Sequence, residues 1–238
     1  MWLAFETATE RASVAVGLSA ADAVEETLAG ARRHAAGLLP MIAAALDRAG
    51  VTLDELTGLA LSDGPGSFTG LRVGASVAKA LVHARGLPLW TAPSLMVRAS
   101  GVAREGDTVL AVADALRGEV YAAAYRFEPE EVVTLLAPSV YRPEMLVEVA
   151  PRPAVVVGQA SPQAAEVLER WSGQRLVGPP EGAPRAGHLI GLVGRRGGAV
   201  RITAVEGWAP EYGRPAEAQA RWEAAHGRPM PDPLGSSR

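Results

Sequence analysis

The pattern of apolar and polar positions divides the start of the chain into strands and one helix. Apolar and polar residues alternate over three short stretches, which predicts a three-strand meander at residues 3–7, 13–18 and 23–28. Apolar residues then recur at helical spacing across residues 32–49. The stripe on this helix consists of Leu38, Ile42 and Leu46, with Leu39 beside it.

A strand, a glycine-rich turn, a second helix and another strand follow, at residues 56–62, 63–70, 70–85 and 87–91. The same order then begins again, with strands at 108–113, 120–127, 132–138 and 154–157 and helices at 143–149, 162–171 and 186–196. This repeat predicts an α/β fold of two ribonuclease H-like lobes, the arrangement of the actin-like ATPase superfamily (ASKHA), with a shorter and degenerate second lobe. We expect the lobes at residues 1–97 and 98–205, and a final helix with a disordered tail at 206–238.

Composition excludes several classes of protein. The 238 residues include no cysteine, which excludes a disulfide framework, thiolate catalysis and cysteine-bound zinc or iron–sulfur sites. The net charge of −3 argues against strong tRNA binding by this chain alone. No apolar run approaches the ~18 residues that would cross a membrane, so we expect a cytoplasmic protein without membrane contact.

The glycine-rich turn is the sharpest motif. Gly64, Gly66, Ser67 and Thr69 lie where a strand turns into a helix, and such turns present backbone N–H groups to anions. The motif is not a Walker A loop, because Leu71 occupies the position of the lysine. Two interpretations stay open: an anion or nucleotide loop, to which Thr7 and Thr9 of the first turn would add hydroxyls, or a tight turn whose glycines only satisfy backbone geometry.

The helix after this turn carries a ridge of small residues. Gly70, Gly74 and Ala78 recur every four residues, with Leu81 close by, so another element can approach closely. The ridge can pack within its own lobe against the helix at 32–49, or the two helices can dock on a partner protein. Both can hold at once.

Several sequence runs resemble one family. The run His34-Ala-Ala-Gly-Leu-Leu-Pro and the later run Gly64-Pro-Gly-Ser-Phe-Thr-Gly-Leu-Arg-Val-Gly resemble the TsaB family, also called YeaZ. Three shorter runs agree with it, at residues 6–9, 114–121 and 210–214. Two positions depart from the family: Glu6 replaces a common aspartate, which weakens metal-assisted phosphate binding there, and Gly213 replaces a bulkier residue.

The resemblance implies a non-catalytic partner, or scaffold, of the transferase TsaD, which places a threonylcarbamoyl group on N6 of adenosine 37 in tRNAs reading codons that begin with A. It also implies that the ATPase TsaE joins the assembly and that this chain contacts tRNA only as part of the complex. When alone, the chain is expected to form a homodimer. The family's dimer surface, carried over to this chain, consists of Leu38, Leu39, Ile42, Leu46, Gly70, Gly74, Ala78 and Leu81. A charge at Ile42 or the change Gly74→Arg is then expected to abolish partner binding while the chain stays folded.

We expect neither catalytic residues nor a metal site. The catalytic relative holds its metal with two histidines four residues apart, whereas here His34 is followed at that spacing by Leu38. The chain is expected to have no cofactor of its own, with ATP or ADP bound weakly or jointly in the complex. The alternative is an autonomous actin-like ATP-binding phosphotransferase or ATPase, which would depend on Glu6 and Asp114.

Overall fold

The computed structural model describes residues 1–30, 34–213 and 226–227. The first lobe consists of β1 (Trp2–Glu6), β2 (Arg11–Gly17), β3 (Val24–Ala29), α1 (His34–Ala49), the short 3-10 helix η2 (Leu53–Glu55), β4 (Gly58–Ser62), α2 (Phe68–Arg85) and β5 (Leu89–Ala92). The second lobe consists of β6 (Thr108–Asp114), β7 (Val120–Phe127), β8 (Val132–Tyr141), α4 (Pro143–Val149), β9 (Val155–Gly158), α5 (Pro162–Ser172) and β10 (Leu176–Val177). Three further elements complete the described chain: α3 (Ser94–Ser100), α6 (Ala186–Leu192) and β11 (Val200–Ile202).

The two sheets share one topology, which confirms the predicted two-lobe, actin-like fold. The first has the strand order β11-β5-β4-β1-β2-β3 and the second the order β10-β9-β6-β7-β8. In each, an antiparallel meander is extended by parallel strands beside its first strand, β4 and β5 in one sheet and β9 and β10 in the other. The second lobe is less regular, since the ladder between β7 and β8 shifts register between Ala122 and Tyr125.

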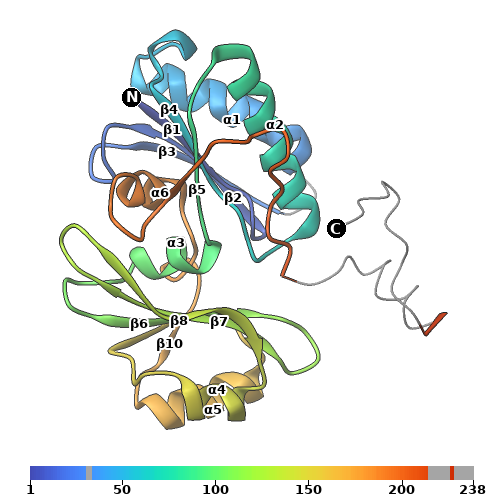
Figure 1. The fold of residues 1–238 in the computed structure, drawn as a ribbon, viewed down its shortest axis with the longest axis vertical. Helices are drawn as coiled ribbons and strands as arrows, with labels where there is room; N and C mark the ends of the chain where they lie inside the picture. The colour runs from blue at the N-terminus through green and yellow to red at the C-terminus, as the bar shows by residue number, and fades with distance from the viewer. Residues whose placement is uncertain (31–33, 214–225, 228–238) are drawn as a thin grey trace.

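The molecule is built in layers (Figure 1). Helices α1 and α2 cover the outer face of the first sheet, α3 and α6 lie between the sheets, and α4 and α5 cover the outer face of the second sheet. Side chains alternate along β1 as a strand between two layers requires: Leu3 and Phe5 join the core under α1 and α2, whereas Ala4 joins the central core.

Small residues on the inner face of the first sheet bring the central layer close. Ala4, Ala15, Ala60 and Ala92 are all fully buried in the central core, where they pack with Leu189 and Ile190 of α6. Small side chains allow a closer approach of helix to sheet than leucine or valine would, and the close fit is what makes this layer continuous across both lobes.

The ends of α2 follow the expected local chemistry. The Ser67 hydroxyl accepts a hydrogen bond from the Gly70 N–H at 3.2 Å, which caps the first turn. At the other end, Gly86 adopts a left-handed conformation with φ of 64° and donates to the Val82 carbonyl.

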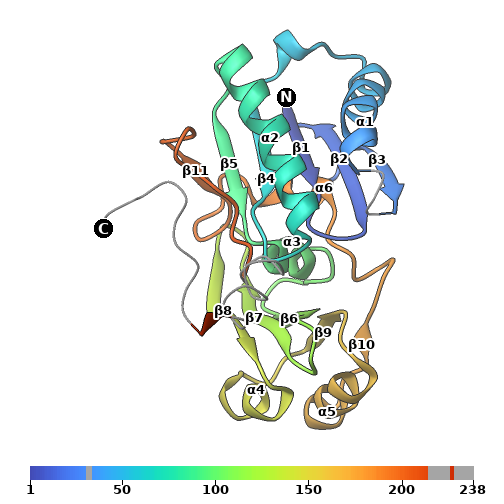
Figure 2. The ribbon, with the colours of Figure 1, turned by 90° about the vertical axis from the view of Figure 1, so that its right-hand side faces the viewer.

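Other elements differ from the prediction. Helix α3 was not predicted, although it fills the space between the lobes. Strand β11 falls inside the range expected for the second lobe, yet it pairs with β5 and extends the first sheet (Figure 2). The helix expected at 186–196 ends at Leu192. The expected final helix at 216–225 lies outside the described residues. Among the helices that are described, none has the length and apolar character needed to cross a membrane.

Candidate functional site

Backbone atoms from other parts of the chain pack closely against two glycines of the turn at 63–70, Gly64 and Gly66. Gly64 has a φ of +110°, and a Cβ there would lie 2.0 Å from the Glu211 carbonyl oxygen. A Cβ at Gly66 would lie 2.3 Å from the Ala8 carbonyl oxygen. These close approaches require glycine for packing alone and support the tight-turn interpretation.

Hydrogen bonds hold the same turn in place. The Ser67 N–H donates to the Ala8 carbonyl at 2.7 Å, and the Ser94 N–H donates to the Gly64 carbonyl at 2.7 Å. Glu211 donates its N–H to the Asp63 carbonyl, also at 2.7 Å. The turn is therefore a junction of β4, the turn after β1, the start of α3 and the C-terminal segment.

The cavity next to this turn is lined by carboxylate side chains. It has a volume of about 480 Å³ and opens between the turn and strands β7 and β8. Its charged lining residues in the described chain are Asp63 and Glu211, both carboxylates. Burial raises the pKa of Asp63 to about 6, and the Glu211 charge adds to this rise. A negative lining disfavours phosphate, so anion binding by Gly64, Gly66, Ser67 and Thr69 stays a prediction without support from the geometry.

The hydroxyls expected to assist that loop lie apart from one another. Thr7 is fully buried, its hydroxyl finds no partner among the described residues, and it faces Gly74 of α2. Thr9 instead completes a local turn, where its hydroxyl donates to the Arg11 carbonyl and accepts from the Arg11 N–H.

Glu6, at the end of β1, is a buried carboxylate between the lobes. One carboxylate oxygen accepts the Ala8 N–H at 2.5 Å, and the other has no partner in the described chain. Burial raises the pKa of Glu6 to about 7, against the opposing effects of Ser62, Ala8 and the Arg98 charge. Glu6 is fully buried and one of its oxygens already accepts a backbone N–H, so this geometry gives no support to the autonomous-ATPase alternative.

Arg98 of α3 links the lobes and was not singled out from the sequence. Its side chain is 3% exposed, and one guanidinium nitrogen donates to the Gly182 carbonyl of the second lobe at 3.1 Å. Burial lowers the pKa of Arg98 to about 10, while the Glu6 charge opposes this. No sequence signal marks it, because α3 itself is too short for a periodic pattern.

Asp114 ends β6 and begins the hairpin that the alternative function would need. One of its carboxylate oxygens accepts the Leu116 N–H at 2.8 Å. Leu116 and Arg117 both have positive φ, at 63° and 54°, although neither is glycine. Asp114 thus supports a tight local turn in this structure.

The ridge of small residues faces the molecule's own sheet. Gly70, Gly74 and Ala78 are buried, and Gly74 lies against Thr7 and Leu61. On α1, the predicted stripe of Leu38, Ile42 and Leu46 is also buried in the core beneath the helices. The expectation that Gly74→Arg leaves a folded chain is therefore wrong, since a large side chain there would collide with the sheet.

The opposite faces of α1 and α2 carry a different apolar set. Of the eight residues expected at the dimer surface, Leu39 is 59% exposed and Leu81 is half-buried. Leu39 lies among other exposed or half-buried apolar residues of α1 and α2. We name this set, Leu39 included, the outer seam: Ala36, Leu39, Ala43, Val73, Val77 and Ala80. Sequence reasoning found only Leu39 of this set, because helical periodicity was used to find the buried stripe and not the face beside it.

One ion pair, one stack and one hydrogen bond lie on the flanks of α1 and α2 away from the outer seam. On the far side of α1, Arg48 pairs with Glu26 of β3. On the far side of α2, Arg72 stacks over Phe68 with its guanidinium carbon 4.1 Å from the ring centre, and Lys79 donates to the Glu206 carbonyl at 2.9 Å. The seam residues occupy the remaining flanks of α1 and α2, two helices that contact each other.

A C-terminal segment, residues 203–213, runs along α2 and back to the lobe junction (Figure 2). Tyr212 packs on Phe68 with ring centres 4.7 Å apart, and Trp208 joins the core beneath α2. Gly213 has a φ of 71°, and a Cβ there would lie 2.6 Å from the Tyr121 ring of the second lobe. We call this segment the strap, because it connects the outer helices of one lobe with a strand of the other.

Comparison with known proteins identifies relatives across most of the chain. Residues 27–169 match the family described as TsaD, tRNA N6-adenosine threonylcarbamoyltransferase. The chain is 36% identical to the tRNA threonylcarbamoyladenosine biosynthesis protein TsaB of Escherichia coli, over 60% of this chain and 65% of that protein, which is just under two thirds of its length. It is 28% identical to the Bacillus subtilis protein of the same name, over 80% of this chain and 84% of that one.

A solved structure agrees with these sequence matches over the whole fold. YeaZ from Pseudomonas aeruginosa is 30% identical in sequence and superimposes with a TM-score of 0.71, covering 89% of this chain and 98% of that one. The repeated lobe topology, the glycine-rich turn before α2 and this full-length similarity agree with one another. The chain therefore belongs to the TsaB (YeaZ) family.

Proposed function

We propose that this chain is a non-catalytic partner of the transferase TsaD in the formation of N6-threonylcarbamoyladenosine on tRNA. The names of its relatives support the pathway. The observation that carries the partner role is the outer seam, an apolar strip left exposed on the two helices that cover the first lobe. Contiguous apolar surface of this kind is typical of a protein–protein interface.

The dimensions of α1 and α2 suit such an interface. They are adjacent helices of 16 and 18 residues, so each is roughly 24–27 Å long at about 1.5 Å per residue. Leu39 is the largest exposed side chain of the seam, at 59% exposed, and is the natural anchor. The buried stripe and the small-residue ridge contribute indirectly, since they fix the two helices on the sheet.

The non-catalytic part of the proposal rests on Leu38. The catalytic relative is expected to bind its metal through two histidines on this helix, and here the second position carries a leucine that is 1% exposed in the core. A buried aliphatic side chain offers no ligand atom. We propose that TsaE and tRNA meet this chain within the complex, and that ATP or ADP is bound there jointly.

A matched pair of variants tests the partner role. Leu39→Asp places a charge in the outer seam, whereas Met145→Asp makes the same change on α4, at a site 52% exposed at the far end of the second lobe. Size-exclusion chromatography with light scattering, on each variant alone and mixed with purified TsaD, should show a heteromeric complex for wild type and Met145→Asp and none for Leu39→Asp. Unchanged thermal unfolding would show that both variants are folded.

The same experiment addresses self-association. If the chain forms a homodimer through the outer seam, Leu39→Asp will be monomeric and added TsaD will consume the wild-type homodimer. A Leu39→Asp chain that binds TsaD as tightly as wild type contradicts the proposed interface. A chain that never binds TsaD contradicts the partner role itself.

A further inference from the structure

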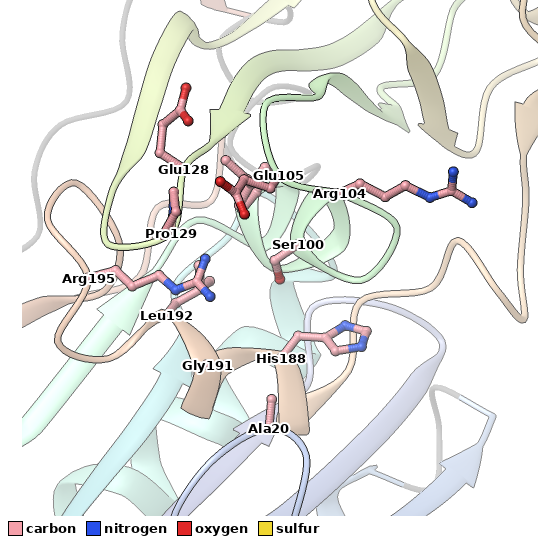
Figure 3. A pocket seen from close by; sticks show the side chains of 12 residues that line it. Ala20, Ser100, Arg104, Glu105, Glu128, Pro129, His188, Gly191, Leu192 and Arg195 are labelled. Atoms are coloured by element: carbon pink, nitrogen blue, oxygen red, sulfur yellow. The ribbon is translucent and has the colours of Figure 1, made fainter.

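A second cavity lies at the lobe junction, lined by different residues from those of the glycine-rich turn and the outer seam. Its volume is about 240 Å³. The residues around it come from the turn after β2, the end of α3, the turn after β7, and α6 with the loop that follows it (Figure 3). We call it the junction pocket. Both lobes contribute to its walls, which is a common location for small-molecule sites.

Two opposite charges face this pocket without neutralising each other. Figure 3 shows the side chains of Glu105 and Arg195 directed toward a common space, whereas Arg104 points away from it. Within the described residues, neither Glu105 nor Arg195 makes a side-chain hydrogen bond or ion pair. Their neighbours do pair: Glu128 with Arg126 at 3.0 Å, and Arg196 with Glu131 at 2.7 Å.

His188 of α6 forms part of the pocket wall. Its ring nitrogen Nδ1 is buried behind that wall and has no hydrogen-bond partner in the described chain. The ring lies against Gly101, where a Cβ would come within 2.3 Å of its Cε1 atom, so this glycine makes room for the imidazole. Burial lowers the pKa of His188, with the Glu25 charge opposing, which favours a neutral ring near pH 7.

The remaining walls are apolar and small. Ala103, Phe127 and Leu192 also line the pocket. A volume of about 240 Å³ is below the ~300–1,000 Å³ of pockets for drug-sized ligands, so the occupant must be a small metabolite.

We propose that the junction pocket binds a small zwitterion of the α-amino acid class. Arg195 would bind the carboxylate, Glu105 would accept hydrogen bonds from the ammonium group, and a short side chain would lie against the apolar wall of the pocket. A simple anion would meet the Glu105 charge, and a simple amine would meet the Arg195 charge, so each alone is disfavoured. A molecule that carries both charges pairs with both residues and leaves neither side chain unpaired.

The proposal predicts a ligand-dependent rise in stability. A ligand that touches both lobes binds the folded chain and not the unfolded one, so it must raise the unfolding temperature as its concentration increases. L-Threonine is a suitable probe, since it is a small α-amino acid with a short side chain. Its amide lacks the carboxylate and N-acetyl-L-threonine lacks the ammonium group, which separates the two charge contacts.

Isothermal titration calorimetry and thermal unfolding of the full chain provide the test. We expect L-threonine to bind wild type, and to bind Arg195→Gln and Glu105→Gln at least about tenfold more weakly, as loss of one charged hydrogen bond implies. Arg196→Gln is the matched control. Arg196 is the next residue in the chain, but its guanidinium pairs with Glu131 and does not line the pocket. The amide and the N-acetyl derivative should each lose most of the affinity.

Three results would overturn the proposal: no binding to wild type, equal binding to the variants, or equal binding of the derivatives. The proposal does not depend on the partner role. Arg195→Gln and Glu105→Gln should bind TsaD as wild type does, so failure of one proposal can be told apart from failure of the other.

Discussion

Gly74 lies directly against Thr7. A Cβ atom at position 74 would come within 2.4 Å of the Thr7 hydroxyl oxygen and 3.1 Å of a methyl group of Leu61. Helix α2 therefore rests on the ends of β1 and β4 at a distance that only glycine allows, and the position of the whole outer layer depends on this contact.

The first prediction concerns this contact. Gly74→Ala should lower the free energy of unfolding by about 1–3 kcal/mol, because the collision with Thr7 outweighs the gain of up to about 1 kcal/mol from better helix propensity. Urea denaturation provides the measurement. Gly207→Ala is the control, since a Cβ there meets no atom within 4 Å and the residue has ordinary φ. An unchanged or raised stability of Gly74→Ala would show that α2 sits farther from the sheet.

The second prediction is a pH dependence of stability caused by Glu6. Folding raises its pKa from 4.5 to about 7, so the folded chain holds this proton more tightly than the unfolded chain does. The contribution of Glu6 to the free energy of unfolding should then be largest below about pH 4.5 and should fall as the pH rises to about 7. The raised pKa corresponds to roughly 3 kcal/mol at about 1.4 kcal/mol per pH unit. Asp63, with its pKa raised from 3.8 to about 6, acts in the same direction.

Glu6→Gln isolates that contribution. The variant should be more stable than wild type at pH 8. Its urea midpoint should fall much less between pH 5 and pH 7 than the wild-type midpoint does. Glu144→Gln, exposed on α4, should follow the wild-type curve at every pH. Parallel curves for Glu6→Gln and wild type would show that Glu6 ionises normally.

The third prediction is energetic coupling between Glu6 and Arg98. Arg98→Met removes the buried guanidinium and its hydrogen bond to Gly182, and it should destabilise the chain by about 3 kcal/mol at pH 8. The same change in a Glu6→Gln background should cost at least about 0.5 kcal/mol less, because no buried negative charge is then left without its cation. A double-mutant cycle by chemical denaturation measures this difference. Strictly additive effects would show that the two charges do not interact.

The fourth prediction concerns the strap. Tyr212→Ala removes the ring that packs on Phe68 and beneath Arg72, so the strap should detach more readily from α2. Limited proteolysis, followed by mass spectrometry, should show faster cleavage within residues 203–213 while the far-UV spectrum stays unchanged. Tyr212→Phe keeps the ring and should be cut at the wild-type rate. If Tyr212→Ala is equally resistant, the other contacts of the strap are sufficient to hold it, among them Trp208, Lys79 and the bond from Glu211 to Asp63.

Local chemistry made the elements of α2 predictable. Ser67 caps its first turn and Gly86 ends it, and each acts on residues three or four positions away. The repeated order of strands and helices was likewise readable from short-range periodicity, and both sheets contain the predicted three-strand meander extended by parallel strands. These features depend on neighbours in the chain, so the sequence alone determines them.

The tertiary structure alone decided which surfaces meet. The ridge of Gly70, Gly74 and Ala78 faces the molecule's own sheet, although its spacing was equally compatible with a partner. Arg98 contacts a residue 84 positions away, and the junction pocket brings together residues as far apart as Ala20 and Arg195, on elements too short for any periodic signal. Periodicity shows that a face is buried but not what covers it, because burial is a property of the packed layers and not of one helix or strand.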